Sequence, residues 1–142
     1  MLDQITVFLE NREGRLKALT RTLAEAQVNM MALTISETSD YGLVRIICDD
    51  ARSAKAALAE RGYRAMVTRV SAVAVPNRPG GLAELLAVFD DLDIAVDYGY
   101  CFSMDDNRAV VVLKVAGDAL ATRAAYALEQ AGFHVLDQDE IA

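Results

Sequence analysis

Hydrophobic and polar positions follow the same order in the two halves of the chain. In the first half, runs rich in β-branched and aromatic residues predict strands at 5–9, 33–36, 43–48 and 64–68. Apolar residues three or four positions apart predict helices at 14–26 and 51–61, and Gly62 ends the second helix. The first half therefore has the element order βαββαβ.

The second half repeats this order, and no linker separates the two halves. Strands are predicted at 70–75, 97–103, 109–115 and 133–136, and helices at 80–91 and 118–131. Turn-forming residues predict hairpins at 39–42 and 105–108. An internal repeat of this kind defines two modules in tandem, 1–69 and 70–142.

Each predicted module contains two right-handed β-α-β crossovers, which produce an open antiparallel sheet with both helices on one face. The predicted fold class is therefore α+β. A module of about 70 residues is near the lower limit at which a domain buries enough surface by itself. We therefore expect each sheet to pack against the sister module or against a second copy of the chain, most simply as a homodimer.

Composition and hydropathy exclude several classes of protein. Of the 142 residues, 54% are hydrophobic and 25% are charged, which is typical of a globular protein and excludes disorder. No apolar run reaches the roughly 20 residues of a membrane helix. Asp3, Glu10 and Arg12 interrupt the N-terminal segment, where a signal peptide would be apolar. We therefore predict a cytoplasmic protein that has no membrane partner.

Charge is unevenly distributed between the two modules. The net charge is −7; residues 1–69 carry ten Lys and Arg against nine Asp and Glu, and residues 70–142 carry four against twelve. An acidic surface repels the phosphate backbone, so we predict no nucleic acid partner. The acidic second module either forms a solvated face or attracts the first module, and the solvated face is the simpler explanation.

A motif at the first turn of each module is the main functional signal. The first copy is Asn11-Arg12-Glu13-Gly14-Arg15-Leu16, and the second, sixty-six positions later, is Asn77-Arg78-Pro79-Gly80-Gly81-Leu82. Each copy joins a predicted strand to a helix, whose first backbone N–H groups have no acceptor within the helix. These groups and the positive end of the helix suit a small anion such as a carboxylate.

Two explanations of the second turn remain open. In the first, Gly80 and Gly81 only permit positive φ angles and close packing, and Pro79 sets the direction of the helix. In the second, N–H groups near Gly80, Gly81 and Leu82 hold the carboxylate of a ligand while Asn77 accepts from its ammonium group. An exposed helix end contributes only about 0.3–1 kcal/mol to such binding, so an apolar pocket has to supply most of the affinity.

The first turn and the segment after the first helix offer further candidates. Glu13 would repel a carboxylate, which favours the second turn over the first. Asn29 is either a left-handed residue at the helix end or, because the second strand returns beside the first, a ligand contact next to the turn. Met30 is more typical of a core or interface position than of a ligand contact.

The sequence predicts no catalysis and no cofactor. The single His134 has no Ser or Cys placed to pair with it. Cys48 and Cys101 lie in apolar runs without CxxC spacing and are predicted to be small core residues. The acidic cluster at 90–93 lacks the spacing of a calcium loop and is predicted to be a solvated patch.

With these elements in order, the chain resembles a tandem pair of ACT domains, which are ferredoxin-like modules that bind amino acids and regulate metabolism. The family turn is commonly Asp/Asn-x-Pro-Gly-x-Leu. The second copy matches all of it, and the first copy has Glu13 in place of the proline. Val28-Asn29-Met30 matches a step that the family favours after the first helix, whereas Ile94-Ala95-Val96 lacks the asparagine. The segment 97–102 is similar to the second strand of stand-alone tandem ACT proteins of bacteria.

The resemblance implies a non-catalytic sensor that binds a free amino acid at interfaces between modules or subunits. The implied ligand-binding residues are Asn11, Arg12, Gly14, Leu16, Asn29, Met30, Asn77, Arg78, Pro79, Gly80, Gly81 and Leu82. The alternative is a regulatory subunit or assembly module of an amino-acid biosynthetic enzyme, similar to the small subunit of acetolactate synthase. Such a module acts by protein–protein contact and has no ligand of its own.

Overall fold

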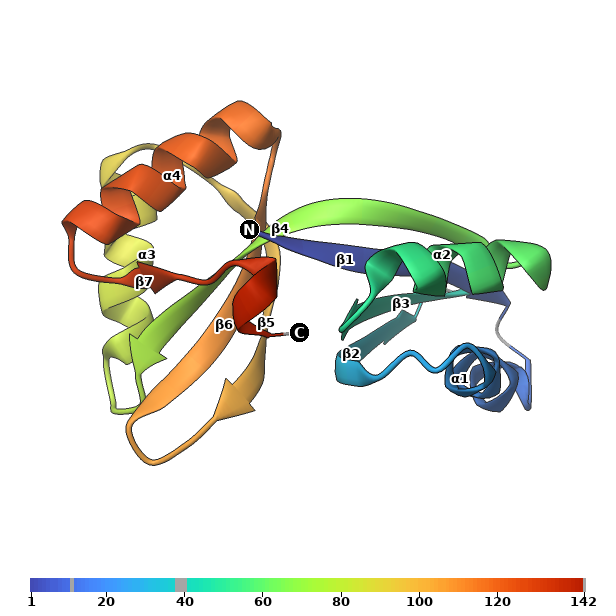
Figure 1. Cartoon of the computed structure of the whole chain (residues 1–142). Helices are drawn as coiled ribbons and strands as arrows, with labels where there is room; N and C mark the ends of the chain where they lie inside the picture. Colours follow the sequence, from blue (N-terminus) through green and yellow to red (C-terminus); the bar gives the residue numbers. More distant parts are fainter. Residues whose placement is uncertain (11, 38–40, 142) are drawn as a thin grey trace. The chain divides into compact units, whose positions relative to one another are not determined.

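The computed structural model describes residues 1–10, 12–37 and 41–141 (Figure 1). The strands are β1 (Leu2–Glu10), β2 (Met30–Glu37), β3 (Tyr41–Cys48), β4 (Arg64–Pro76), β5 (Val96–Met104), β6 (Arg108–Val115) and β7 (His134–Val135). The helices are α1 (Arg15–Glu25), α2 (Ala51–Glu60), α3 (Gly81–Asp91), α4 (Asp118–Gln130) and the short 3-10 helix η1 (Gln138–Glu140). The chain divides into an N-terminal unit, Asp3–Thr68, and a C-terminal unit, Arg69–Ile141 with Met1–Leu2.

Each unit has the βαββαβ order and an antiparallel sheet, which confirms the predicted α+β, ferredoxin-like fold class. The strand order is β2-β3-β1-β4 in the N-terminal unit and β5-β6-β4-β7 in the C-terminal unit. In each unit the strand that precedes the first helix is central: β1 in the N-terminal unit and β4 in the C-terminal unit. The second β-α-β crossover of the unit places the last strand along the side of this central strand that the hairpin leaves unpaired. The strand-to-helix turn therefore begins in the middle of each sheet, where neighbouring strands can surround it.

The cores of the two units are built from corresponding positions. In the N-terminal unit, Val7 of β1 packs with Leu19 and Leu23 of α1, and α2 adds Ala54 and Leu58. In the C-terminal unit the corresponding side chains of β4 and α3 are Val73, Leu85 and Phe89, each sixty-six positions later. Because side chains alternate along a strand, one face of each sheet meets both helices and the other face does not. Both helices of each unit therefore lie on one face of its sheet, as predicted (Figure 1).

Strand β4 differs from the sequence-based prediction. Two strands, 64–68 and 70–75, were expected there, whereas the structure has one continuous strand, Arg64–Pro76. The physical reason is that no Gly, Pro, Asn or Asp interrupts this segment before Pro76. The residues up to Thr68 belong to the N-terminal unit, and those from Arg69 belong to the C-terminal unit.

The two cysteines have different environments. Cys48 is fully buried on β3, and burial raises the pKa of its thiol to about 11. Cys101 is exposed on β5, an outer strand of its sheet. The prediction of a core position is therefore confirmed for Cys48 and wrong for Cys101, because an apolar stretch at a sheet edge is not covered on both faces.

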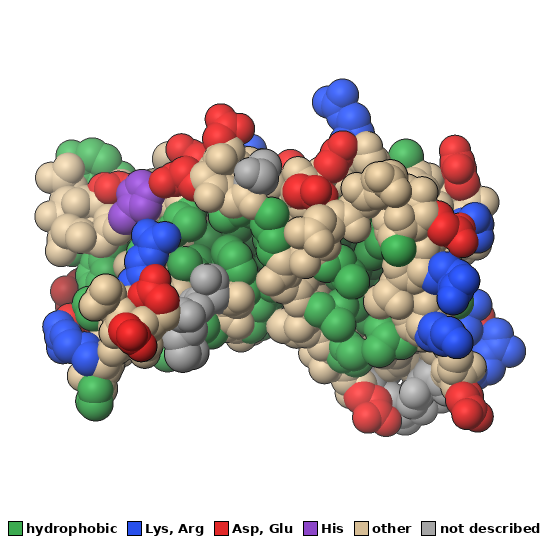
Figure 2. All heavy atoms as spheres, turned by 60° about the horizontal axis from the view of Figure 1, so that its bottom comes forward, with side chains coloured by type: hydrophobic (Ala, Val, Ile, Leu, Met, Phe, Trp, Pro, Cys, Tyr) green, Lys and Arg blue, Asp and Glu red, His purple; other side chains and the backbone are tan. Residues whose placement is uncertain are grey.

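Within the described part of the chain, no helix is both long enough and apolar enough to cross a membrane. Hydrophobic side chains nevertheless reach the surface of both units (Figure 2). The large ones that are more than a third exposed are Phe8, Leu16, Leu33, Ile35, Tyr41, Met66, Val67, Leu82, Leu86 and Tyr126.

Candidate functional site

The turn between β4 and α3 is closed by its own backbone hydrogen bonds. The amide of Arg78 donates to the Pro76 carbonyl at 2.9 Å, and the amide of Gly81 donates to the Arg78 carbonyl at 3.0 Å. Gly80 precedes the helix with a φ of 90°, and no described side chain caps the helix. The amides of Gly80, Leu82 and Ala83 donate to no group among the described residues. Three donors at the positive end of α3 are therefore open to a ligand.

The turn between β1 and α1 repeats this geometry in its described part. The amide of Arg12 donates to the Glu10 carbonyl at 2.8 Å, and the amide of Arg15 donates to the Arg12 carbonyl at 3.3 Å. Gly14 has a φ of 82°, and again no described side chain caps the helix. Asn11, the first residue of the predicted motif, lies outside the described residues. The described parts of the two turns thus share two backbone hydrogen bonds and a left-handed glycine, at positions sixty-six residues apart.

Asn77 connects its turn to the hairpin between β5 and β6. Its side-chain Nδ2 donates to the backbone carbonyl of Asp105, and its amide donates to the Asn107 carbonyl at 3.0 Å. The Asp105 carboxylate closes the hairpin by accepting from the amides of Arg108 and Asn107, and these bonds hold the pKa of Asp105 below its ordinary value. The side-chain oxygen of Asn77 has no donor among the described residues, so it can accept from a ligand.

The arginines of both turns form ion pairs with neighbouring glutamates. Arg78 reaches Glu84, in the first turn of α3, at 3.0 Å to both carboxylate oxygens. Arg12 reaches Glu10 at 2.5 Å. All four side chains are at least half exposed, so these pairs contribute little to stability and leave little positive charge for a ligand.

Gly81 permits the close packing that the first explanation of this turn predicts. A Cβ atom on Gly81 would lie 2.2 Å from the carbonyl oxygen of Pro76, so only glycine fits there. The neighbouring Pro79 is exposed in the turn, and Leu82 is 47% exposed on the first turn of α3. Gly81 therefore brings the helix close to the strand end, while Leu82 presents an apolar surface beside the open amides.

Asn29 and Met30 lie at the other end of the sheet from the turn of their own unit. Met30 is paired with Cys48, whereas Gly42, at the opposite end of β3, is paired with Glu37 of β2 and with Leu9 of β1. The expectation that Asn29 lies beside the turn is therefore wrong within one unit, because β2 runs parallel to β1 and begins at its far end. Met30 is half-buried against the core.

The backbone of Asn29 is also occupied by its own unit. The Asn29 amide donates to the Asp49 carboxylate at 2.9 Å, and the Asn29 carbonyl accepts from the Asp49 amide at 3.1 Å. The left-handed residues after the first helices are Gln27, with a φ of 61°, and Asp93, with a φ of 54°. The predicted left-handed conformation therefore occurs two residues before Asn29.

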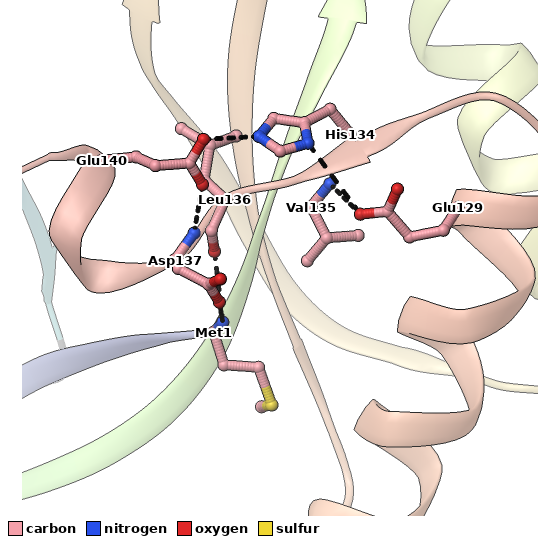
Figure 3. Close-up of polar contacts among 7 residues, drawn as sticks. All are labelled: Met1, Glu129, His134, Val135, Leu136, Asp137 and Glu140. Carbon is pink, nitrogen blue, oxygen red and sulfur yellow. Dashed lines mark hydrogen bonds and ion pairs between the residues drawn. The ribbon is translucent and has the colours of Figure 1, made fainter.

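His134 lies between two carboxylates of the C-terminal unit (Figure 3). Its Nε2 is 2.6 Å from Glu140, and its Nδ1 is 3.9 Å from Glu129. Glu140 also accepts from the Asp137 amide, and this bond, with the contact to His134, lowers the pKa of Glu140. The figure shows that these side chains come from α4, β7 and η1 and meet at the end of the unit. Within the described ranges, no group of three or more His, Cys, Asp or Glu side chains could hold a metal ion.

The structure also brings together residues that the sequence analysis did not select. Arg15, Tyr63 and Arg64 line a cavity of about 290 Å³ next to the first turn. Arg15 belongs to the first copy of the motif, at the position that corresponds to Gly81 in the second copy. This difference between the two copies is the feature of the sequence that could have identified Arg15 as a candidate. Tyr63 and Arg64 join it only after the sheet has formed, so no local pattern pointed to them.

Comparison with known proteins agrees with this architecture. A family model described as an ACT domain pair matches residues 1–139. Protein BT0572 from Bacteroides thetaiotaomicron is 31% identical, with a TM-score of 0.88 over 95% of this chain and 91% of that chain. No curated protein matches.

Two regulatory subunits of aspartate kinase have the same fold at lower identity. The ligand-free subunit from Thermus thermophilus is 18% identical, with a TM-score of 0.66 and 91% of each chain covered. The subunit from Thermus flavus is also 18% identical, with a TM-score of 0.59 over 93% of this chain and 94% of that chain. The family model includes both units and both strand-to-helix turns. The chain therefore belongs to the ACT domain pair family, a family of regulatory-type domains.

Proposed function

We propose that this protein is a non-catalytic regulator that binds a free amino acid at the turn between β4 and α3. The observation that carries this proposal is the set of open amides at Gly80, Leu82 and Ala83, which lie beside an apolar surface. The ligand carboxylate accepts from these amides at the positive end of α3. The side-chain oxygen of Asn77 accepts from the ligand ammonium group.

The apolar surface on α3 supplies the affinity that the amides do not. An anion at a partly buried helix end gains up to about 2 kcal/mol, whereas a millimolar Kd requires about 4 kcal/mol. Leu82 is 47% exposed and Leu86, one helical turn later, is 37% exposed. Side chains four residues apart lie on one face of a helix, so the two leucines form a continuous contact for the ligand side chain. A ligand with an apolar side chain fits this surface best.

The corresponding site of the N-terminal unit is the weaker of the two. Leu16 corresponds to Leu82 and is 36% exposed, but Thr20 takes the place of Leu86. Glu13 adds negative charge in the turn, where Pro79 stands in the second copy. Repulsion of the ligand carboxylate by Glu13 favours the C-terminal unit.

Regulation follows if the ligand completes a contact between two copies of the chain. Asn29 and Met30 lie too far along their own sheet to meet the turn of the same unit, so their contribution requires a neighbouring unit. A second copy that supplies its β2 strand closes the open side of the turn. The ligand then shifts the association equilibrium by no more than its difference in affinity for the two states.

Isothermal titration of the intact protein with each of the twenty amino acids tests the proposal. An apolar amino acid is expected to bind, and sedimentation velocity is expected to show a larger assembled fraction in its presence. A flat titration for all twenty amino acids with well-folded protein would contradict the proposal.

A pair of matched variants identifies the site. Ala83 is exposed at the third position of α3, where Glu can accept from the Gly80 amide as in a capping box. Ala83→Glu is therefore expected to stabilise the helix and to abolish amino acid binding. Ala87→Glu adds the same charge one turn further along the exposed surface and is expected to retain binding. Equal binding by both variants would place the ligand elsewhere.

A regulatory subunit that acts by protein contact alone is the second candidate. The observation that favours it is β2, an outer strand of the N-terminal unit, on which Leu33 is 39% exposed and Ile35 is 53% exposed. An outer strand with exposed apolar side chains can pair with a strand of another protein. Recovery of one enzyme in stoichiometric amount by affinity capture, together with a flat amino acid titration, would select this function.

A further inference from the structure

The N-terminal unit contains a cavity of about 290 Å³ that is separate from the open amides of α3. It lies at the C-terminal end of β1, where the first residues of α1, β3 and β4 meet. Strand register brings Glu10 opposite Tyr41 at this end of the sheet. The side chains that define its chemistry are Phe8, Glu10, Arg15, Tyr41, Tyr63 and Arg64.

Two guanidinium groups in this cavity are held in place by aromatic rings. The Arg15 guanidinium carbon lies 5.4 Å from the centre of the Tyr63 ring, and that of Arg64 lies 5.4 Å from the centre of the Phe8 ring. Phe8 in turn meets Tyr41 edge-to-face, with 6.1 Å between ring centres. A stacked arginine loses less freedom when it binds an anion, because its position is already fixed.

These two cations have no carboxylate partner among the described residues. The salt bridges of the N-terminal unit are Arg12 with Glu10 and Arg61 with Glu25, and neither includes Arg15 or Arg64. Glu10 also lines the cavity, but Arg12 neutralises it at 2.5 Å. The Nε atom of Arg15 is buried and makes no hydrogen bond. A buried donor without a partner is uncommon in a folded protein, and an acceptor on a bound anion would satisfy it.

We propose that this cavity binds a small organic dianion, whose anionic groups accept from the guanidinium groups of Arg15 and Arg64. Carboxylates and phosphates both present two oxygens that accept bidentate hydrogen bonds from the planar guanidinium group. The cavity volume is at the lower end of the range for small-molecule sites, so the ligand has only a few carbon atoms. This site is separate from the proposed amino acid site of the C-terminal unit, because no residue of α3 lines it, and it adjoins the first turn, where amino acid binding is expected to be weaker.

Among the described residues, the corresponding positions of the C-terminal unit lack the groups that define this cavity. Gly81 stands where Arg15 stands in the first copy, and the Pro76 carbonyl excludes any side chain there. Ala74 takes the place of Phe8 and is paired with His134, so neither the aromatic ring nor the second guanidinium is present. The structure therefore predicts one dianion per chain.

Titration with succinate, as a dicarboxylate, and with methyl phosphate, as a phosphomonoester, tests this proposal on the intact protein at low salt. Succinamide is the uncharged control. We expect one of the two dianions to bind with a stoichiometry of one per chain, more weakly at high salt, and succinamide not to bind. The tighter of the two identifies the ligand as a carboxylate or a phosphate. Absence of binding by both at millimolar concentration to folded protein would overturn the proposal.

Three variants assign the binding to the cavity. Arg64→Met removes the guanidinium from an exposed position and retains an apolar stem, so it is expected to fold; Arg15→Met is the second test. Each is expected to weaken dianion binding by at least about tenfold, which corresponds to the loss of one charge-assisted hydrogen bond. Arg123→Met removes the same charge from the exposed surface of α4 and is expected to change binding less than twofold. An equal loss in all three variants would show unspecific attraction and overturn the proposal.

The two proposals can be rejected independently of each other. Ala83→Glu is expected to remove amino acid binding and to retain dianion binding, whereas Arg64→Met is expected to do the reverse. If Arg64→Met retains full dianion binding while its circular dichroism spectrum matches that of the original protein, the cavity is not the site.

Discussion

The carbonyl oxygen of Pro76 occupies the space in which any side chain on Gly81 would begin. A Cβ atom built on Gly81 lies 2.2 Å from that oxygen, which is far inside van der Waals contact. The atom in the way belongs to the backbone, so it cannot move without moving β4. At the first turn, the corresponding pair is Glu10 and Arg15, and there the helix begins with a full side chain. The two turns share their hydrogen bonds but differ in how closely the helix approaches the strand.

Gly81→Ala is therefore expected to destabilise the protein by about 1–3 kcal/mol, the usual cost of forcing extra atoms into a packed site. Gly80→Asn is the matched control, because Asn tolerates the left-handed conformation of that residue. Urea unfolding measures both variants. A Gly81→Ala protein as stable as the original would show that the strand and helix do not approach so closely.

Asn77→Asp is expected to reduce stability by about 1 kcal/mol, because it removes the donor to the Asp105 carbonyl and retains the shape of the side chain. Arg78→Ala removes the exposed ion pair with Glu84 in the same turn and is expected to cost less. Thermal unfolding of the two variants compares these contributions. A larger loss in Arg78→Ala would mean that the ion pair, and not the amide, holds the turn to the hairpin.

Acid stability depends in part on Asp50, which caps α2. Its carboxylate accepts from the Ser53 hydroxyl at 2.6 Å and from the Ser53 amide at 3.0 Å, and these bonds lower the pKa of Asp50. A carboxyl whose pKa is lower in the folded state contributes stability that is complete above its unfolded pKa, about 3.9 for Asp. That stability is lost as the pH falls through the folded pKa.

Asp50→Asn retains an oxygen that can cap the helix but cannot titrate. It is therefore expected to lose less stability than the original protein when the pH falls from about 5 to about 2. Melting temperatures measured across this range test the expectation. Parallel curves for the two proteins would show that Asp50 does not contribute to the acid response.

The two thiols are expected to differ sharply in reactivity. Cys101 is exposed, whereas Cys48 is fully buried with a pKa of about 11, so little thiolate forms and reagents do not reach it. Brief treatment of the native protein with iodoacetamide at mildly alkaline pH is expected to modify Cys101 alone. In urea both should react. Mass spectrometry of peptides that shows Cys48 modified as fast as Cys101 in the native protein would contradict the burial of β3.

Local sequence patterns were sufficient for the elements and for their order. Strands and helices depend on periodicities of two and of about four residues, which can be read without knowing what the chain packs against. The glycines of the repeated turn were equally informative, because Gly14 and Gly80 have the positive φ angles that such a turn requires. The break expected within β4 did not occur, since a boundary between two units leaves no local mark when the strand continues through it.

Contacts between residues that meet only after the strands pair could not be predicted from local sequence patterns. Asn29 was expected beside the first turn, but the register of β2 with β3 places it at the far end of the sheet. Tyr63 and Arg64 lie three and four positions beyond the end of α2, and nothing local associates them with Arg15. Their meeting depends on the position of β4 next to β1.

By itself, the sequence determined a duplicated βαββαβ chain whose two halves each turn from a strand into a helix through a glycine-containing motif. It did so because propensity, periodicity and turn chemistry act between near neighbours. Only the tertiary structure decided which amides stay open among the described residues, why Gly81 has to be glycine, and that Arg15 and Arg64 line one cavity. Those outcomes depend on strand register and on backbone approach across the sheet, which involve residues that are distant along the chain.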